Sequence, residues 1–215
     1  MAIPIRGLSQ FKTALSGGGA RPNLFEVRLP DDFPADPQGF RISDFGRRSR
    51  FMCKAASLPA SIASPIEVPF RGRTLKVSGD RQFESWTVTI INDEDFEIRR
   101  AMEGWMQALN QYSDHSGLTE PASYMRDAQV FQLGRGKVNV EAGQGSGGNA
   151  NILAQYHFQD IYPTNVGPID LSYDSENTIE EYTVEFQVQF WYPVRDFKRA
   201  NTWFVFHYKY YYSIL

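Results

Sequence analysis

Two glycine-rich stretches are the first places where this sequence could hold a phosphate group. Gly143 to Gly148 reads GQGSGG and satisfies G-x-G-x-x-G, a pattern that lets backbone approach a pyrophosphate. That chemistry needs a helix after the glycines within a βαβ unit, and no helical pattern follows here. Gly134 to Lys137 lacks the spacing and the Ser or Thr of a Walker loop. Neither stretch predicts a nucleotide site, and no cofactor is expected.

Residues that could bind a metal or act as a nucleophile are scattered. Asp93, Glu94 and Asp95 stand where a helix is expected to begin, so the helix dipole explains them, and they lack the glycine and distant glutamate of a calcium loop. The three histidines have unrelated spacings, and no G-x-S-x-G sequence occurs. Cys53 is the single cysteine, which excludes an intrachain disulfide and is expected to be a buried small hydrophobe. The sequence predicts neither an enzyme nor a metal site.

Alternating apolar and polar residues predict a mainly β protein. At 215 residues the chain suits one elaborated domain. Strands are expected over 23–29, 51–55, 85–92, 128–133, 152–161 and 179–191, with a hairpin of 66–70 and 73–77 turning at Arg71-Gly72, and with bends at 57–65 and 163–168. Apolar residues then recur every three or four positions from Phe96 to Leu109, which predicts one amphipathic helix capped by Asn92.

Proline and glycine divide the chain into a β domain with irregular insertions. We expect an N-terminal arm over 1–19, the domain over 20–192 with excursions at 36–50 and 134–151, and a C-terminal extension over 193–215. The arm from Ser9 to Gly19 and the first excursion are expected at subunit contacts, because ordering irregular segments needs compensating burial. Trp203 to Ser213 has aromatic residues on both alternating faces, which predicts a strand covered within an assembly.

Charge is unevenly distributed along the sequence. From Val138 to Val194 there is no Lys or Arg, and the carboxylates there contribute −8, so the formal net charge of −3 leaves +5 for the remainder. Much of that surplus falls in one short run, Arg41, Arg47, Arg48 and Arg50. No secretory signal or membrane anchor is expected, because the aromatic-rich C-terminus is too short to span a bilayer. We therefore expect synthesis in the cytoplasm.

Four blocks of sequence, taken together, resemble one known family. They are Ala20 to Phe25 (ARPNLF), Cys53 to Ala60 (CKAASLPA), Gly79-Asp80-Arg81 with Trp86 to Thr89 (GDR, WTVT), and Tyr162 to Gly167 (YPTNVG). In order and spacing they are similar to the tail tube proteins of contractile-tailed bacteriophages, over roughly 20–191. The resemblance implies two packed antiparallel β-sheets, sandwich- or barrel-like, with one flanking α-helix. It also implies hexameric rings that stack into a hollow tube.

The function that the resemblance implies is structural, in the virion, after synthesis in the host cytoplasm. The tube would be a conduit for DNA ejection, with DNA passing through the lumen without specific binding. The implied partners are a contractile tail sheath protein, a tape-measure protein and a baseplate tube initiator; related secretion-system tubes share the architecture. The resemblance assigns no role to the arginine run or to the C-terminal extension. We take Arg41, Arg47, Arg48 and Arg50 as candidate contacts with a subunit or the sheath.

One strand face is a candidate lining for the lumen. Along 179–191 the polar residues Glu181, Thr183, Glu185, Gln187 and Gln189 share one face, opposite an apolar one. An acidic wall repels phosphates and lets a duplex slide, whereas a basic wall retains it. The alternative is an ordinary solvated or interface surface.

Other functions remain open at the level of sequence. A baseplate tube initiator would share the fold and differ mainly in added segments. The arginine run allows a nucleic-acid-binding module, although +5 outside the acidic stretch is modest and no recognised binding fold is present. An enzyme is the third alternative.

Overall fold

The computed structural model describes residues 7–15, 18–32, 34, 45–135 and 151–194. Within them the chain forms four helices and nine strands, all strand pairs being antiparallel. In chain order they are α1 (Leu8–Ala14), β1 (Phe25–Arg28), α2 (Phe45–Met52), β2 (Cys53–Ala56), β3 (Ser61–Phe70), β4 (Arg73–Phe83), β5 (Trp86–Ile91), α3 (Glu97–Leu109), α4 (Pro121–Tyr124), β6 (Arg126–Gly134), β7 (Asn151–Val166), β8 (Glu181–Gln187) and β9 (Phe190–Pro193). The predicted fold class, mainly β with two antiparallel sheets, is confirmed.

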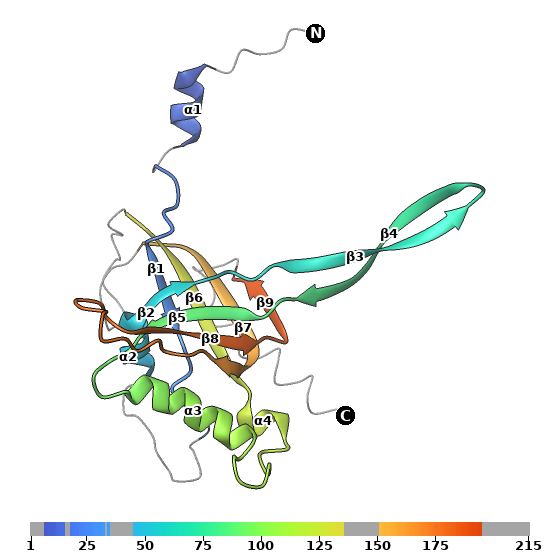
Figure 1. The fold of residues 1–215 in the computed structure, drawn as a ribbon. Helices are drawn as coiled ribbons and strands as arrows, with labels where there is room; N and C mark the ends of the chain where they lie inside the picture. Colours follow the sequence, from blue (N-terminus) through green and yellow to red (C-terminus); the bar gives the residue numbers. More distant parts are fainter. Residues whose placement is uncertain (1–6, 16–17, 33, 35–44, 136–150, 195–215) are drawn as a thin grey trace, which may run out of the picture.

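The larger sheet has seven strands, in the order β1-β6-β7-β8-β5-β2 with β9 also paired to β7 (Figure 1). β7 joins its two halves, because residues up to Ile161 pair with β6 whereas Tyr162 to Val166 pair with β8. The smaller sheet is the β3–β4 hairpin alone. This hairpin extends far beyond the rest of the body (Figure 1).

A local polar cluster fixes the bend in β7. Asp160 has a positive φ of 54°, and β7 has an extra residue here, because Gln159 and Asp160 together lie opposite Asp127 of β6. The carboxylate of Asp127 accepts the Asp160 backbone N–H at 3.1 Å and lies 3.5 Å from His157 Nε2. Desolvation opposes ionisation of Asp127, but these hydrogen bonds and the His157 charge lower the pKa of its carboxyl overall. Asp127 thus contacts β7 at both His157 and Asp160, beside the bulge.

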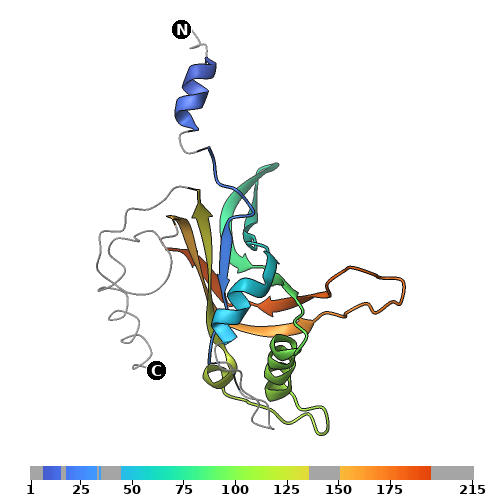
Figure 2. The same ribbon diagram turned by 90° about the vertical axis from the view of Figure 1, so that its left-hand side faces the viewer.

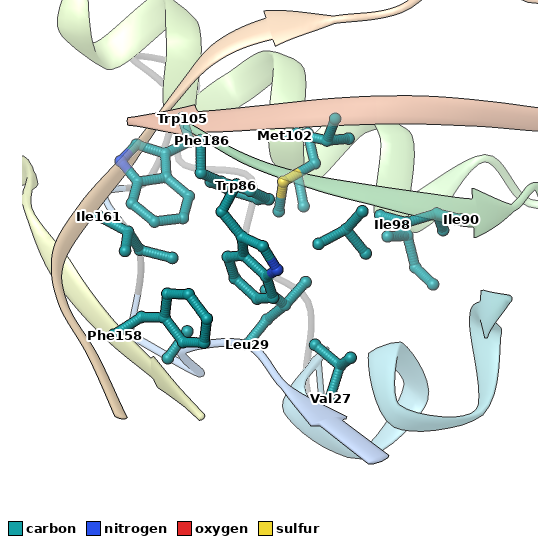
Figure 3. Packing of buried hydrophobic residues seen from close by; sticks show 14 of the residues in the cluster. Val27, Leu29, Trp86, Ile90, Ile98, Met102, Trp105, Phe158, Ile161 and Phe186 are labelled. Carbon is teal, nitrogen blue, oxygen red and sulfur yellow. The ribbon is translucent and has the colours of Figure 1, made fainter. Parts of the chain in front are cut away.

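The core lies between the two halves of the sheet and is closed by α3 (Figure 3). Trp86 of β5 stacks on Phe158 of β7 at 4.5 Å between ring centroids and lies 5.5 Å from Phe186 of β8. Helix α3 contributes Ile98, Met102 and Trp105, all fully buried. The Trp105 indole N–H donates to the Tyr124 carbonyl at 2.9 Å, which satisfies a polar group that burial would otherwise penalise.

The predicted cap of α3 is wrong. The helix begins at Glu97, after Phe96 at a left-handed φ of 54°, so Asp93 to Asp95 precede it instead of forming its first turn. Asn92 is engaged elsewhere: its backbone N–H donates to the Glu180 carbonyl and its side-chain amide to the Glu180 carboxylate, both at 2.9 Å. Tertiary pairing at the end of β5 therefore outcompetes local capping.

Other boundaries also differ from the sequence-based expectations. Residues 45–50, expected within an irregular excursion, are helical in α2, and residues 9–14 of the arm expected to be irregular lie in α1. The expected bends at 57–65 and 163–168 largely become strand, and the expected long strand 179–191 is broken between β8 and β9. Arg41, the glycines of 143–148 and the expected strand 203–213 lie outside the described residues.

Candidate assembly surfaces

The β3–β4 hairpin is amphipathic, and its apolar face is exposed. The antiparallel register places Ile66 opposite Val77 and Val68 opposite Leu75, on the same face as Phe70. The other face carries polar pairs such as Glu67 with Lys76, whose charged atoms are 3.3 Å apart. Phe70 is 67% and Leu75 60% exposed, which is unusual for side chains of this size arranged in a row.

The backbone conformation of the turn and a close approach between the strands allow this hairpin to form a long ribbon. Its two-residue turn, Arg71-Gly72, has positive φ at both positions, the conformation that matches the twist of two paired strands. Nearer the body, the register shifts between Ala63 and Pro65. There Gly79 faces the Ser64 carbonyl oxygen so closely that a Cβ would lie 2.3 Å from it, so a side chain is excluded. An isolated two-stranded ribbon is marginally stable in water, so this hairpin is suited to packing against another surface.

Helix α1 forms a second exposed apolar surface. Leu8, Phe11 and Leu15 follow one another at spacings of three and four, and all are exposed. The helix stands clear of the β body in both views (Figures 1 and 2). This spacing is a helical signal that the sequence reading missed. A seven-residue helix is too short to be stable alone, so it too is suited to docking on another surface.

The candidate lumen residues lie mainly on the outward face of β8. Glu181 and Thr183 are exposed, Glu185 and Gln187 are half-buried, and Gln189 lies exposed beyond the strand's end. Lys54 of β2 forms an ion pair with Glu181, and the Ser85 hydroxyl donates to Glu185 at 2.6 Å. The face is therefore polar and ordered, but it is not purely acidic.

The arginine run is partly committed to its own subunit. Arg48 forms an ion pair with Glu97 of α3, and Arg50 lies 3.7 Å from Glu26 of β1. Arg47 is exposed, and no ion pair joins it to another described residue. Arg47, Arg48 and Arg50 all lie on α2, and of these three only Arg47 forms no ion pair with another described residue.

The described residues contain little that suggests chemistry. They include no group of three His, Cys, Asp or Glu side chains able to hold a metal, and no helix among them is long and apolar enough to cross a membrane. Burial raises the pKa of the Cys53 thiol to about 12, so it is not a ready nucleophile.

An open hollow of about 500 Å³ lies between α3 and the end of β7. Its cation, Arg99, is already engaged by Glu103 and the Gly167 carbonyl.

Comparison with known proteins identifies the family. The model of the phage tail tube protein family matches residues 20–193. The chain belongs to this family. It is 34% identical over 177 residues to the tail tube protein gp19 of Enterobacteria phage T4, a match that covers 82% of this chain and 93% of gp19. It is therefore a structural component of the virion tail, as the sequence predicts.

Solved structures share the fold at much lower identity. A chain of the anti-feeding prophage tube-terminating cap has a TM-score of 0.54 and 14% identity, covering 83% of this chain and 92% of that one. A chain of the sheath–tube complex of an extracellular contractile injection system, in the extended state, has a TM-score of 0.52 and 13% identity. That match covers 88% of this chain and 99% of the other. These likenesses support the tube-protein architecture.

Proposed function

We propose that this tail tube protein polymerises as stacked hexameric rings into the hollow inner tube of a contractile phage tail, the conduit for DNA ejection. The observation that carries the proposal is the uncovered apolar face of the β3–β4 hairpin. A subunit that remained monomeric would expose this face to water, whereas a neighbour would cover it. Family membership supplies the class of assembly, and the hexameric number follows the family resemblance.

Ring closure and stacking need surfaces on different sides of the subunit. A head-to-tail contact makes a ring when its rotation closes, and further contacts along the axis then stack the rings. The hairpin and α1 leave the body separately, so one can serve within a ring while the other reaches an adjacent ring (Figure 1). The similar fold in a sheath–tube complex supports a sheath as outer partner. We propose exposed Arg47, and Arg41, as contacts to a subunit or that sheath.

Electron microscopy of the purified, concentrated protein tests this function. We expect long homopolymeric tubes with a central channel and sixfold end views. Isolated rings that elongate only on a separate tube protein would favour a baseplate initiator. A monomer that forms neither rings nor tubes, alone or with sheath and baseplate proteins, would contradict the proposal. Measured salt-sensitive retention of DNA by the monomer would favour the nucleic-acid-binding alternative.

We further propose that the outward face of β8 lines the lumen. Its support is a continuous polar surface on which Thr87 pairs with Glu185 and Thr89 with Thr183. Across this surface Lys54 offsets only one of the two carboxylates on β8. Stacked rings would repeat the remaining negative charge along the whole tube, so DNA would pass through the lumen without specific binding. During assembly the same lumen would hold a tape-measure protein.

Reversing the charge of this face should slow DNA ejection. With Glu181→Lys and Glu185→Lys, the wall would bind phosphates by counterion release, so ejection should be on the order of tenfold slower at 50 mM than at 200 mM salt. Ejection from purified virions, followed by a DNA-binding dye, measures this. Glu94→Lys with Asp95→Lys is the matched control, because both residues are exposed outside β8 and the net charge changes equally. Equal kinetics for the two variants at low salt would contradict a luminal position.

A further inference from the structure

The segment between β7 and β8 is an exposed acidic and aromatic loop that the fold itself does not use. Within 168–180, Leu171 is 79%, Tyr173 fully and Ile179 71% exposed. Asp170, Asp174 and Glu176 lie among them, and the segment contains no Lys or Arg. Large apolar groups exposed together are typical of a protein interaction surface, and the carboxylates beside them would lie at its polar rim.

Local hydrogen bonds give this loop a shape. The Asp174 backbone N–H donates to the Ser172 hydroxyl and the Ser175 N–H to the Ser172 carbonyl, each at 3.2 Å. At its C-terminal end, Glu180 accepts two hydrogen bonds from Asn92. The loop is therefore anchored to the end of β5, which lowers the entropy lost when a partner binds.

The tip of the β3–β4 hairpin has the opposite character. Arg71 lies in the turn and Arg73 directly follows it, and no ion pair joins either to another described residue. The Arg71 guanidinium lies over the Phe70 ring, 5.5 Å from its centroid. Lys76, by contrast, is paired with Glu67 on the polar face. The tip thus presents a large aromatic ring and two free cations, the complement of an aromatic, acidic loop.

The two surfaces lie on opposite sides of the subunit. In Figure 1 the hairpin extends to the right of the body, while the orange-red loop before β8 lies at its left-hand edge. They cannot meet within one chain. Complementary patches on opposite sides of a protein are what a head-to-tail contact between identical copies requires, since each copy uses a different patch toward each neighbour.

We propose that the tip of the β3–β4 hairpin of one copy docks on the 168–180 loop of the next copy. Arg71 and Arg73 face Asp174 and Glu176, and Phe70 packs beside Tyr173. This pairing rests on the proposed self-assembly and names the two surfaces that would meet in it, the hairpin tip and the 168–180 loop. Apolar burial supplies most of the affinity, whereas the charges select the register and disfavour hairpin-to-hairpin contacts, where like charges meet.

A charge exchange between two variants tests the pairing. The hairpin variant carries Arg71→Glu and Arg73→Glu, and the loop variant carries Asp174→Arg and Glu176→Arg. Each alone should fail to assemble at the concentration at which the unaltered protein forms tubes, because like charges meet at every contact. An equimolar mixture should assemble, since each hairpin then finds an opposite loop, and so should one chain carrying all four changes. All four sites are exposed, so thermal melting should show unaltered folding.

The outcomes separate this pairing from the proposed function. If the unaltered protein forms tubes but neither the mixture nor the fourfold variant does, the pairing is overturned and the function stands. If either variant alone assembles normally, the pairing is also overturned. Failure of the unaltered protein to form rings or tubes under any condition overturns both. As a direct measurement, Arg73→Cys with Glu176→Cys should give intermolecular disulfide ladders on oxidation, while Cys53 alone, half-buried with the pKa of its thiol raised to about 12, should give none.

Discussion

Replacing Val68 and Leu75 by serine should sharply raise the concentration needed for tube formation while leaving the isolated subunit as stable as before. These two side chains lie opposite each other on the apolar face of the hairpin and are 43% and 60% exposed. Neither belongs to the core, so their loss removes little from the free subunit. Burying each of these side chains stabilises an interface by about 1.5 to 3 kcal/mol. Losing both should therefore raise the concentration needed for assembly by about a hundredfold or more.

Sedimentation across a concentration series, with electron microscopy of the pellets, measures this shift. The matched control is Glu67→Gln with Lys76→Gln, a facing pair on the polar side of the same hairpin, exposed and joined by a surface ion pair. Such pairs contribute at most about 1 kcal/mol, so this variant should assemble near the unaltered concentration. Tubes from the serine variant at the unaltered concentration would show that the apolar face is not an interface.

Regular periodicity made much of the body predictable from sequence. In β5 the residues Trp86, Val88 and Ile90 are buried as their alternation predicts, and in β8 the same holds for Tyr182 and Val184. These strands have one face on the core and one on water, so the alternation of apolar and polar residues predicts which side chains are buried. The α3 helix follows for the same reason, since its buried residues recur every three or four positions.

Proline and long-range pairing explain most of the errors. Pro65 and Pro163 lie next to register shifts within β3 and β7, where irregular pairing tolerates a residue without an N–H, so a strand continues through what looks like a bend. The Lys54–Glu181 ion pair joins residues 127 positions apart, which no local pattern can foresee. For the hairpin, alternation predicted the strands but not whether the apolar face meets its own core or another copy.

Truncating Trp86 to alanine should cost about 3 to 5 kcal/mol of unfolding free energy, a large part of the 5 to 15 kcal/mol that holds a typical domain folded. Its ring is wholly buried, stacked on Phe158 and close to Phe186, so it joins both halves of the sheet (Figure 3). The cavity would lie where those halves meet and could not collapse easily. Urea unfolding followed by far-ultraviolet circular dichroism measures the loss without relying on tryptophan fluorescence.

Two further variants separate cavity formation from other effects. Phe51→Ala removes an aromatic side chain that is 78% exposed on α2, and should change stability by less than about 0.5 kcal/mol. Trp86→Phe should cost much less than alanine, because it keeps an aromatic ring and removes an indole N–H that is buried without a partner among the described residues. Equal losses for phenylalanine and alanine would contradict a packing role for this ring.

The Trp86→Ala variant should also assemble poorly, because the core is directly connected to the projecting hairpin. β4 ends at Phe83 and β5 begins at Trp86, so only two residues separate the projecting hairpin from the centre of the core. Phe83 makes an edge contact with Trp191 of β9, at 6.1 Å between ring centroids, which fixes the base of the hairpin against the same body. A cavity at Trp86 would loosen that base and add to the entropy lost on docking. Tube formation should therefore weaken even at temperatures where the variant subunit is still folded.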